Sequence, residues 1–275
     1  MRGFSLFFRV RKSMIESTSN AGVKQVIGLI EKSKIRKKEN AFVVEGPRMV
    51  FETPMRLLKK VYVSEKNTFG SEEEKKLLSM VQQGVFVEEV TEKVMKAMTD
   101  TVTPQGILAV VEKPAYQLED LLTNVPLLLV LETIQDPGNL GTMIRTAEGA
   151  GCSGVILSSD TVDIFSPKVV RSTMGSLYRM PFYIADDLKA TIAALKKTGI
   201  SFFAAHLDGE KCYDEFDYKQ PTAFLIGNEG NGLSDDIANM ADEKIRIPMA
   251  GKLESLNASM AAGILAYEAA RIRRK

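Results

Sequence analysis

Short apolar segments alternate with longer amphipathic segments along the first 112 residues of the chain. The short segments predict strands at 41–44, 60–64, 84–88 and 107–111. The longer segments, in which apolar residues recur every three or four positions, predict helices at 21–33, 46–53, 71–82 and 91–97. Residues 16–112 are therefore expected to form a compact α/β domain.

From residue 127 onward, the predicted strands are apolar at nearly every position. They are expected at 127–131, 155–158, 182–185, 202–205, 223–226 and 245–247. The helices between and after them are expected at 140–150, 167–177, 187–198, 234–241 and 255–273. Strands that are apolar on both faces are typical of a parallel sheet covered by helices on both sides. We therefore expect a second α/β domain over residues 126–275, after a linker at 113–125.

The last predicted helix is rich in small residues, which would allow another element to approach its backbone closely. These residues are Ala258, Ala261, Ala262, Gly263, Ala266, Ala269 and Ala270. Two partners fit this pattern equally well, namely another element of the same chain or a second copy of the chain.

Composition excludes several classes of protein. The 275 residues are 45% hydrophobic and 26% charged, and no apolar run approaches the roughly 18 residues that a membrane helix needs. The two cysteines are too few for a disulfide framework and lack the ligand spacing of a zinc site. We therefore expect reduced thiols, no metal, no membrane partner and a cytoplasmic location. The single histidine, His206, lies in an apolar stretch and is interpreted as a strand-end residue rather than a catalytic base.

The first thirteen residues combine basic side chains with the apolar segment 4–8, but they lack the length and cleavage site of a secretory signal. We expect residues 1–15 to be a disordered tail, or an extension upstream of a translation start at Met14. N-terminal sequencing of the native protein would distinguish these two possibilities.

Charge is distributed unevenly, although the net charge is only +1. Residues 1–115 contain 20 Lys and Arg against 14 Asp and Glu, a net of +6, whereas residues 116–275 contain 16 against 21, a net of −5. A basic surface suits RNA phosphates, although a solvated helix end would look similar. The densest basic segment supplies the candidate RNA contacts Lys24, Lys32, Lys34, Arg36, Lys37 and Lys38.

The segment Gly149 to Gly154 matches the dinucleotide-binding pattern GxGxxG, but it follows a predicted helix and precedes a strand. The pattern binds pyrophosphate where its glycines lead from a strand into a helix, which is the opposite order. We therefore interpret this segment as a helix C-cap and turn, and a nicotinamide-dependent oxidoreductase is disfavoured.

Three polar segments that contain glycine or small polar residues follow predicted strands of the second domain, at residues 135–145, 226–233 and 247–259. Each has a simple structural explanation, such as a helix N-cap at Asn139 or Ser255, or a turn at Glu229. In a parallel sheet, however, loops at the carboxyl ends of strands converge on one edge, where α/β proteins bind ligands. Together the segments predict a pocket of backbone polar groups in which Arg145 and Glu229 carry charge.

These segments resemble the three motifs of the SpoU-type (SPOUT superfamily, TrmH-like) RNA ribose 2′-O-methyltransferases. The resemblance rests on the six-residue step from Asn139 to Arg145, on Gly-Asn-Glu-Gly at 227–230 and on Ser-Leu-Asn at 255–257. Segments 42–46 and 98–106 are similar to the substrate-binding domain that precedes the catalytic domain in this family, and 167–175 is similar to a catalytic-domain segment. The resemblance covers residues 16–273. Its departures are small: valine is commoner at Ala258 and Met260, and serine is usual at Thr173.

The resemblance implies a C-terminal α/β-knot, in which the chain end passes through a loop as a deep trefoil knot, with a smaller N-terminal ribosomal-protein-like α/β domain. It also implies S-adenosylmethionine as the cofactor and a homodimer formed through the C-terminal domain. The residues expected to hold the cofactor are Ile226, Gly227, Asn228, Gly230, Ile247, Met249, Leu256 and Asn257.

The residues that the resemblance assigns to catalysis are Arg145, Asn139, Glu229, Ser255 and Asn257. A methyl group on a sulfonium is already activated, so the protein has to align a ribose 2′-oxygen, remove its proton and exclude water. Arg145 is expected to act as the base or as the group that orients ribose and phosphate. Because a free guanidinium has a pKa of about 12.5 or above, stabilising the developing alkoxide is physically easier than abstracting the proton.

The expected reaction is methyl transfer to a ribose 2′-hydroxyl of RNA, with 23S-type ribosomal RNA as the substrate. The alternatives are a methyltransferase acting on transfer RNA and a non-catalytic RNA-binding protein. RNA recognition depends on shape and on contacts with unpaired loops, which no motif encodes. The motifs therefore leave the target nucleotide open.

Overall fold

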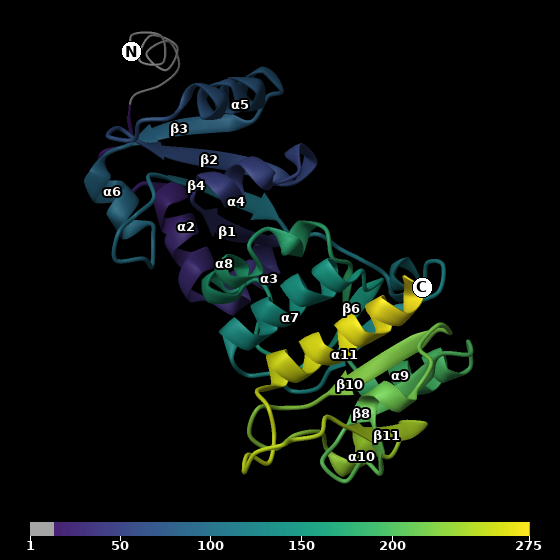
Figure 1. The fold of residues 1–275 in the computed structure, drawn as a ribbon. Helices are drawn as coiled ribbons and strands as arrows, with labels where there is room; N and C mark the ends of the chain where they lie inside the picture. Colours follow the sequence, from purple (N-terminus) through teal and green to yellow (C-terminus); the bar gives the residue numbers. More distant parts are fainter. Residues whose placement is uncertain (1–13, 275) are drawn as a thin grey trace. The chain divides into compact units, whose positions relative to one another are not determined.

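The computed structural model describes residues 14–274, so residues 1–13 of the expected tail lie outside the described residues. The expectation was wrong at Ile15, which pairs with Val90 and donates a backbone hydrogen bond of 2.9 Å to the carbonyl of Glu89. The chain forms two compact units (Figure 1). The first unit extends to Pro114 and also includes Phe165–Arg171, and the second contains Ala115–Ile164 and the chain from Ser172 onward. A short segment of the second half of the sequence thus belongs to the first unit.

The first unit is built on a four-stranded mixed sheet in the order β1-β4-β2-β3. Its strands are β1 (Ala41–Glu45), β2 (Leu58–Ser64), β3 (Phe86–Val90) and β4 (Ile107–Glu112). Strand β4 is antiparallel to β1 and β2, whereas β2 is parallel to β3. All four lie within two residues of the predicted strands, because alternation of apolar side chains is a local property of the sequence.

The helices of the first unit are α2 (Ala21–Glu31), α3 (Ser33–Glu39), α4 (Pro47–Glu52), η1 (Met55–Leu57), α5 (Ser71–Gln82) and α6 (Glu92–Ala97). Helix α3 was not predicted. The buried Arg36 accounts for the break before it, because its guanidinium donates to the carbonyls of Leu29 at 2.6 Å and Ile30 at 3.0 Å. These are carbonyls at the end of α2 that have no partner within the helix.

The core of the first unit lies between one face of the sheet and helices α2 and α6. Val26 and Leu29 of α2 and Met95 of α6 pack against Val43 and Leu108 of the strands. Residues 165–171, which include most of α8 (Pro167–Thr173), also pack in this unit, since the Phe165 ring lies 5.1 Å from that of Phe42.

The second unit contains a seven-stranded sheet in the order β7-β6-β5-β10-β8-β11-β9. Its strands are β5 (Leu127–Leu131), β6 (Gly154–Ser158), β7 (Phe182–Ala185), β8 (Ser201–Ala205), β9 (Lys211–Cys212), β10 (Thr222–Ile226) and β11 (Glu243–Arg246). Every neighbouring pair is parallel. The predicted parallel sheet is confirmed, and only the two-residue strand β9 was missed.

Helices cover both faces of this sheet, as predicted. The helical elements are η2 (Leu118–Leu121), α7 (Pro137–Ala150), η3 (Ser176–Tyr178), α9 (Leu188–Lys196), η4 (Tyr213–Glu215), α10 (Asp235–Ala238) and α11 (Ala258–Arg273). Helices α9 and α10 pack on one face, and α7 and α11 lie together on the other (Figure 1). Leu121 of η2 is buried in the core beneath α9. Part of the expected linker is therefore core of the second unit.

The small residues of α11 serve packing within the chain. Ala262, Ala266 and Ala269 are fully buried. A Cβ on Gly263 would lie 3.4 Å from Thr146 Cγ2 of α7, and one on Gly149 would lie 2.8 Å from the Tyr267 hydroxyl. Close approach of α7 to α11 therefore accounts for much of the small-residue pattern.

Two interpretations of single residues are confirmed. Gly151 adopts φ +76° as the C-cap of α7, so the GxGxxG match is a helix end. His206 follows β8 directly, and its Nδ1 accepts a hydrogen bond from the backbone N–H of Asp208 at 3.2 Å. Within residues 14–274, no helix is long and apolar enough to span a membrane.

Arg273, near the end of α11, connects that helix to the loops beneath it. Its guanidinium donates hydrogen bonds of 2.7–3.0 Å to the carbonyls of Val125, Pro126, Tyr218 and Gln220. We expect Arg273→Ala to lower the free energy of unfolding by about 2 kcal/mol, because partly buried carbonyls lose a charged donor. Urea denaturation measures this change.

Arg271→Ala is the matched control for this prediction. Arg271 pairs with Glu268 on the same helix, and its side chain is 49% exposed. The Glu268 side chain is only 11% exposed, but this pair lies within one helix and Arg271 donates to no backbone carbonyl of another segment within residues 14–274. We expect the loss in Arg271→Ala to be smaller, about half that in Arg273→Ala. Equal losses in the two variants would contradict the role assigned to Arg273.

Candidate functional site

Three loops of the second unit, which follow β5, β10 and β11, meet at one end of the sheet. One follows β5 and leads into α7, one follows β10 and leads into α10, and the third runs from β11 to α11. Strands β5 and β10 are neighbours in the sheet, so the first two loops begin side by side. The three loops contain the three segments that the sequence analysis identified.

Glu229 joins the loop after β10 to the loop after β5. Its carboxylate accepts hydrogen bonds from the backbone N–H of Gln135 at 3.2 Å and of Asp136 at 3.1 Å, and from Asn139 Nδ2 at 3.0 Å. Asp136 in turn caps α7, since its side chain accepts from the Asn139 N–H at 2.8 Å. Glu229 therefore holds the first turn of α7 in place.

Asn139 extends this network to the third loop. Its Oδ1 accepts a hydrogen bond of 3.0 Å from Asn257 Nδ2, across 118 residues of sequence. Asn257 caps α11 by accepting from the backbone N–H of Ser259 at 2.9 Å. The structure thus brings Glu229, Asn139 and Asn257 into one continuous chain of hydrogen bonds.

The environment of Glu229 favours its ionised form. Partial burial alone would raise the pKa of the Glu229 carboxyl, but the hydrogen bonds from Asn139 and from nearby backbone N–H groups outweigh it and lower the pKa. A carboxylate that accepts several donors remains charged at neutral pH.

Acid is expected to weaken this network. Because the folded-state pKa of Glu229 lies below its unfolded value of about 4.3, the carboxylate stabilises the fold fully above that pH and loses this contribution as the pH falls through the folded-state pKa. Glu229→Gln should therefore lose less thermal stability than the wild type between about pH 6 and about pH 3.5. Thermal unfolding at both pH values measures the difference.

Glu254→Gln is the control for this comparison. Glu254 is an exposed carboxylate of the third loop with no hydrogen-bond partner in the described part of the chain. Its variant should follow the wild-type pH dependence. If Glu229→Gln does the same, the carboxylate is not the source of the acid sensitivity.

The turn after β10 is organised by Asn228. Its backbone N–H and C=O pair with those of Gly232, each at 2.9 Å, and its Oδ1 accepts from the Gly230 N–H at 2.8 Å. A Cβ on Gly227 would lie 2.1 Å from the backbone carbon of Gly232. The turn closes so tightly that only glycine fits at position 227.

A second network beside the first was not predicted from the sequence. Thr133 adopts φ +53°, an uncommon conformation for a β-branched residue. It is held there by hydrogen bonds from its N–H to Ser158 Oγ at 2.8 Å and from its hydroxyl to Asp160 Oδ2 at 2.7 Å. These residues and the acidic side chains Asp186 and Asp187 line a groove of about 410 Å³ at the ends of β5, β6 and β7. No local pattern marks Thr133, because its conformation depends on partners from another loop.

Arg145 and Ser255 stand apart from the hydrogen-bond network. Arg145 lies on α7, six residues and roughly 9 Å along the axis from Asn139. Both side chains are exposed, and neither has a hydrogen-bond or ionic partner within residues 14–274. The charged group of Arg145 is thus available to a ligand.

The residues expected to hold a cofactor surround the same edge of the sheet. Ile226 ends β10 and is buried, whereas Ile247, Met249 and Leu256 of the third loop are half-buried. Within residues 14–274, the backbone of residues 248–256 makes no hydrogen bond, so its polar groups are available. The loop after β8 also reaches this edge, since a Cβ on Gly209 would lie 2.6 Å from the Ile245 backbone. The sequence analysis missed this loop because it carries no motif.

The basic segment of the first unit is mostly exposed. Lys24, Lys32, Lys34, Lys37 and Lys38 all reach solvent. Arg36 is the exception, because it is only 4% exposed and donates to the end of α2. The expectation that Arg36 contacts RNA was therefore wrong, since its guanidinium is occupied by backbone carbonyls.

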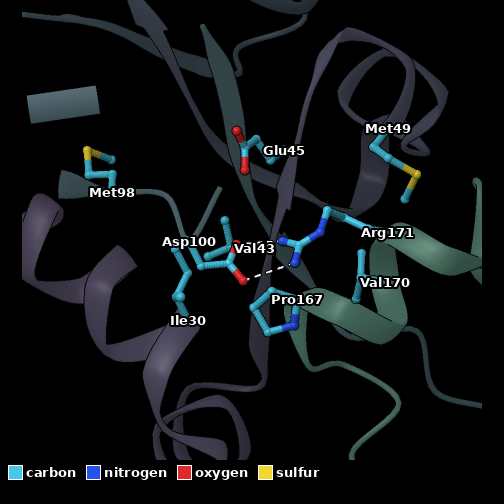
Figure 2. Close-up of a pocket in the computed structure, with 9 residues that line it drawn as sticks. All are labelled: Ile30, Val43, Glu45, Met49, Met98, Asp100, Pro167, Val170 and Arg171. Carbon is cyan, nitrogen blue, oxygen red and sulfur yellow. Dashed lines mark hydrogen bonds and ion pairs between the residues drawn. The ribbon is translucent and has the colours of Figure 1, made fainter. Parts of the chain in front are cut away.

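The first unit also encloses a small cavity, shown in Figure 2. It is lined by Ile30, Val43, Glu45, Met49, Met98, Asp100, Pro167, Val170 and Arg171. Arg171 reaches Asp100 from α8 with hydrogen bonds of 2.5 and 3.1 Å. The cavity volume of about 10 Å³ is close to that of a single water molecule, which excludes a nucleoside.

Comparisons with known proteins agree with the division into two parts. Residues 126–267 match the SpoU rRNA Methylase family, and residues 20–109 match the MRM3-like substrate binding domain. The 23S rRNA (guanosine(2553)-2′-O)-methyltransferase RlmP of Bacillus subtilis is 34% identical over 255 residues, which are 92% of this chain and 97% of that protein. The 23S rRNA (uridine(2479)-2′-O)-methyltransferase of Streptomyces viridochromogenes is 38% identical over 178 residues, which are 62% of this chain and 61% of that protein.

Solved structures show the same likeness. The crystal structure of an AdoMet-bound rRNA methyltransferase from Sinorhizobium meliloti superposes with a TM-score of 0.83 at 33% identity, covering 94% of this chain and 97% of that one. At this identity and coverage, both units have counterparts in that protein.

Proposed function

The chain belongs to the SpoU rRNA methylase family, and from this premise we propose that it transfers a methyl group from S-adenosylmethionine to a ribose 2′-hydroxyl of 23S-type ribosomal RNA. The observation that carries the proposal is the hydrogen-bonded chain from Glu229 through Asn139 to Asn257, which unites the three motif loops. Arg145 lies on the same helix as Asn139 and has no partner among the described residues. The Bacillus subtilis relative RlmP, which spans both units, acts on 23S ribosomal RNA according to its name.

The edge of the sheet suits S-adenosylmethionine. The residues that would hold it are Ile226, Gly227, Asn228, Gly230, Ile247, Met249, Leu256 and Asn257. The half-buried apolar side chains suit an adenine ring, and the free backbone groups of residues 248–256 suit the polar parts of the molecule. When bound, this cofactor supplies an activated methyl group on a sulfonium.

The protein's own residues then have three tasks. Asn139, Glu229 and Asn257 hold the loops and the start of α7 in a fixed geometry, which pre-organises the site. Arg145, which has no protein partner among the described residues, would bind the ribose and phosphate and stabilise charge that develops on the 2′-oxygen. Ser255 is exposed on the third loop and would contact the RNA or the cofactor.

We keep the knot and the homodimer as parts of this proposal. The knot is supported by the path of the chain, which runs from β11 near one edge of the sheet back to pack α11 against α7, β10 and β5. The dimer is supported by Met260 and Tyr267, which leave 58% and 47% of their surface exposed on α11. If sedimentation velocity finds only monomer, the proposed homodimer is wrong. The cytoplasmic location stays a prediction.

The test is methyl transfer from labelled S-adenosylmethionine into total RNA of a strain that lacks this gene, followed by nucleoside mass spectrometry. We expect a 2′-O-methylated nucleoside in large-subunit ribosomal RNA. The relatives modify guanosine or uridine, so the labelled base would narrow the target. Label in transfer RNA would correct the substrate, and no transfer to any RNA would leave the non-catalytic RNA-binding protein as the better account.

A further inference from the structure

Loop 99–106 of the first unit joins α6 to β4 and is held by a buried carboxylate. Glu45, the last residue of β1, is only 9% exposed. Its Oε1 accepts hydrogen bonds from Thr101 Oγ1 at 2.8 Å and from the Gln105 N–H at 3.1 Å. One oxygen of the Glu45 carboxylate therefore binds the residues on both sides of segment 102–104.

Further contacts fix the base of this loop. Gly46 adopts φ +94°, and a Cβ there would lie 2.3 Å from the Gln105 side chain, so the loop lies directly against this residue. Asp100 pairs with Arg171 through two hydrogen bonds (Figure 2). The conformation of the loop is thus determined by contacts on both sides.

The tip of the loop projects into solvent. Val102 is 96% exposed, the largest exposed fraction among the large apolar residues of the described chain. A lone exposed valine on a loose loop would need no explanation. Here, however, a carboxylate is desolvated to hold the loop that presents it, and rigidly positioned exposed loops are typical of recognition surfaces.

Exposed lysines at the end of α2 lie near this loop. Ile30 of α2 and Asp100 of the loop line the same small cavity (Figure 2). The loop therefore lies beside the end of α2, after which Lys32 and Lys34 of the basic segment are exposed.

We propose that loop 99–106 contacts an unpaired nucleotide of RNA, with Val102 against the face of the base and the exposed lysines at the end of α2 near the phosphates. The inference rests on the proposed function in that the partner is RNA. A valine cannot bind a phosphate, and the faces of paired bases are covered by their stacked neighbours, so this contact requires an unstacked base. It gives the first unit a preference for RNA loops and bulges over continuous helices.

The experiment compares the affinity of the full-length protein for two labelled RNA hairpins of equal length, one with an unpaired bulge and one fully paired. We expect the wild type to bind the bulged hairpin more tightly. Val102→Ser should weaken binding to the bulged hairpin about 5- to 10-fold, the effect of losing a buried apolar side chain, without changing affinity for the paired hairpin or its salt dependence. Val125→Ser, which alters another exposed valine in the second unit, should bind both RNAs as the wild type does.

A second pair of variants tests the anchoring of the loop. Thr101→Val removes the hydrogen bond to Glu45 and should reduce the preference for the bulged hairpin, whereas Thr101→Ser keeps the hydroxyl and should restore it. Thermal unfolding would show that all four proteins are folded.

Two outcomes would overturn the inference. They are equal wild-type affinity for the two hairpins, and a Val102→Ser variant that binds the bulged hairpin like the wild type. The proposed function has its own readout, because methyl transfer to ribosomal RNA by the wild type is measured separately. If the wild type methylates RNA but Val102→Ser binds the bulged hairpin as the wild type does, the proposed function stands. The proposed contact between loop 99–106 and an unpaired nucleotide is then wrong.

Discussion

Arg145→Ala should reduce methyl transfer to RNA by about 100-fold or more, while the protein keeps its fold and its affinity for S-adenosylmethionine. The side chain is exposed and has no hydrogen-bond partner in the described part of the chain, so its removal leaves no buried group unpaired. The loss should appear in kcat or in RNA binding, since only the reacting ribose and its phosphate would contact the guanidinium. Single-turnover transfer from labelled cofactor, together with calorimetric titration of the cofactor, measures both quantities.

Arg274→Ala is the matched control for Arg145. It removes an exposed arginine at the end of α11, away from the three loops, and should leave turnover within about twofold of the wild type. Near-normal turnover in Arg145→Ala would show that this residue has no role in methyl transfer. Loss of cofactor binding in that variant would instead show that Arg145 supports the fold of the site.

Gly227→Ala should weaken binding of S-adenosylmethionine by about tenfold or more. A Cβ at this position would lie 2.1 Å from the backbone of both Gly232 and Leu233. Backbone cannot move aside as a flexible side chain does, so the turn after β10 has to open. Because this turn carries Asn228 and Glu229, its opening should also disturb their hydrogen bonds with the loop after β5.

Gly230→Ala provides the comparison within the same turn. The nearest atom to a Cβ at this position is Asn228 Oδ1 at 3.5 Å, an ordinary contact. Isothermal titration should therefore show a smaller loss of cofactor affinity for Gly230→Ala than for Gly227→Ala. Equal losses would mean that the crowding at Gly227 is not what maintains the site.

The strands and most helices follow from local patterns. Leu127–Leu131 is apolar at every position, and the structure places it as β5 between neighbours on both sides. The limits of this local information are clear at Arg36. A basic residue in a basic segment was expected to contact RNA, but its guanidinium is used by carbonyls of the preceding helix. Sequence patterns report the type of a side chain and do not report its partner.

The candidate site also combines features that the sequence predicts with contacts that it does not. The three loop segments and the order of the strands that precede them can be identified along the chain, and the family resemblance proposes residues for methyl transfer. The contact between Asn139 and Asn257 spans 118 residues, and the positive φ of Thr133 depends on Ser158 and Asp160 in another loop. Neither leaves a local signal, because both arise only when the sheet brings distant loops together.

By itself, therefore, the sequence determined the fold class and the parallel sheet of this protein, since burial and periodicity are properties of short segments, and its motifs carried the family resemblance. Only the tertiary structure decided that Glu229, Asn139 and Asn257 form one network, that Arg36 is structural, and that a buried Glu45 holds Val102 in solvent. The physical reason is that hydrogen-bond partners and exposure are set by the packing of segments far apart in the chain.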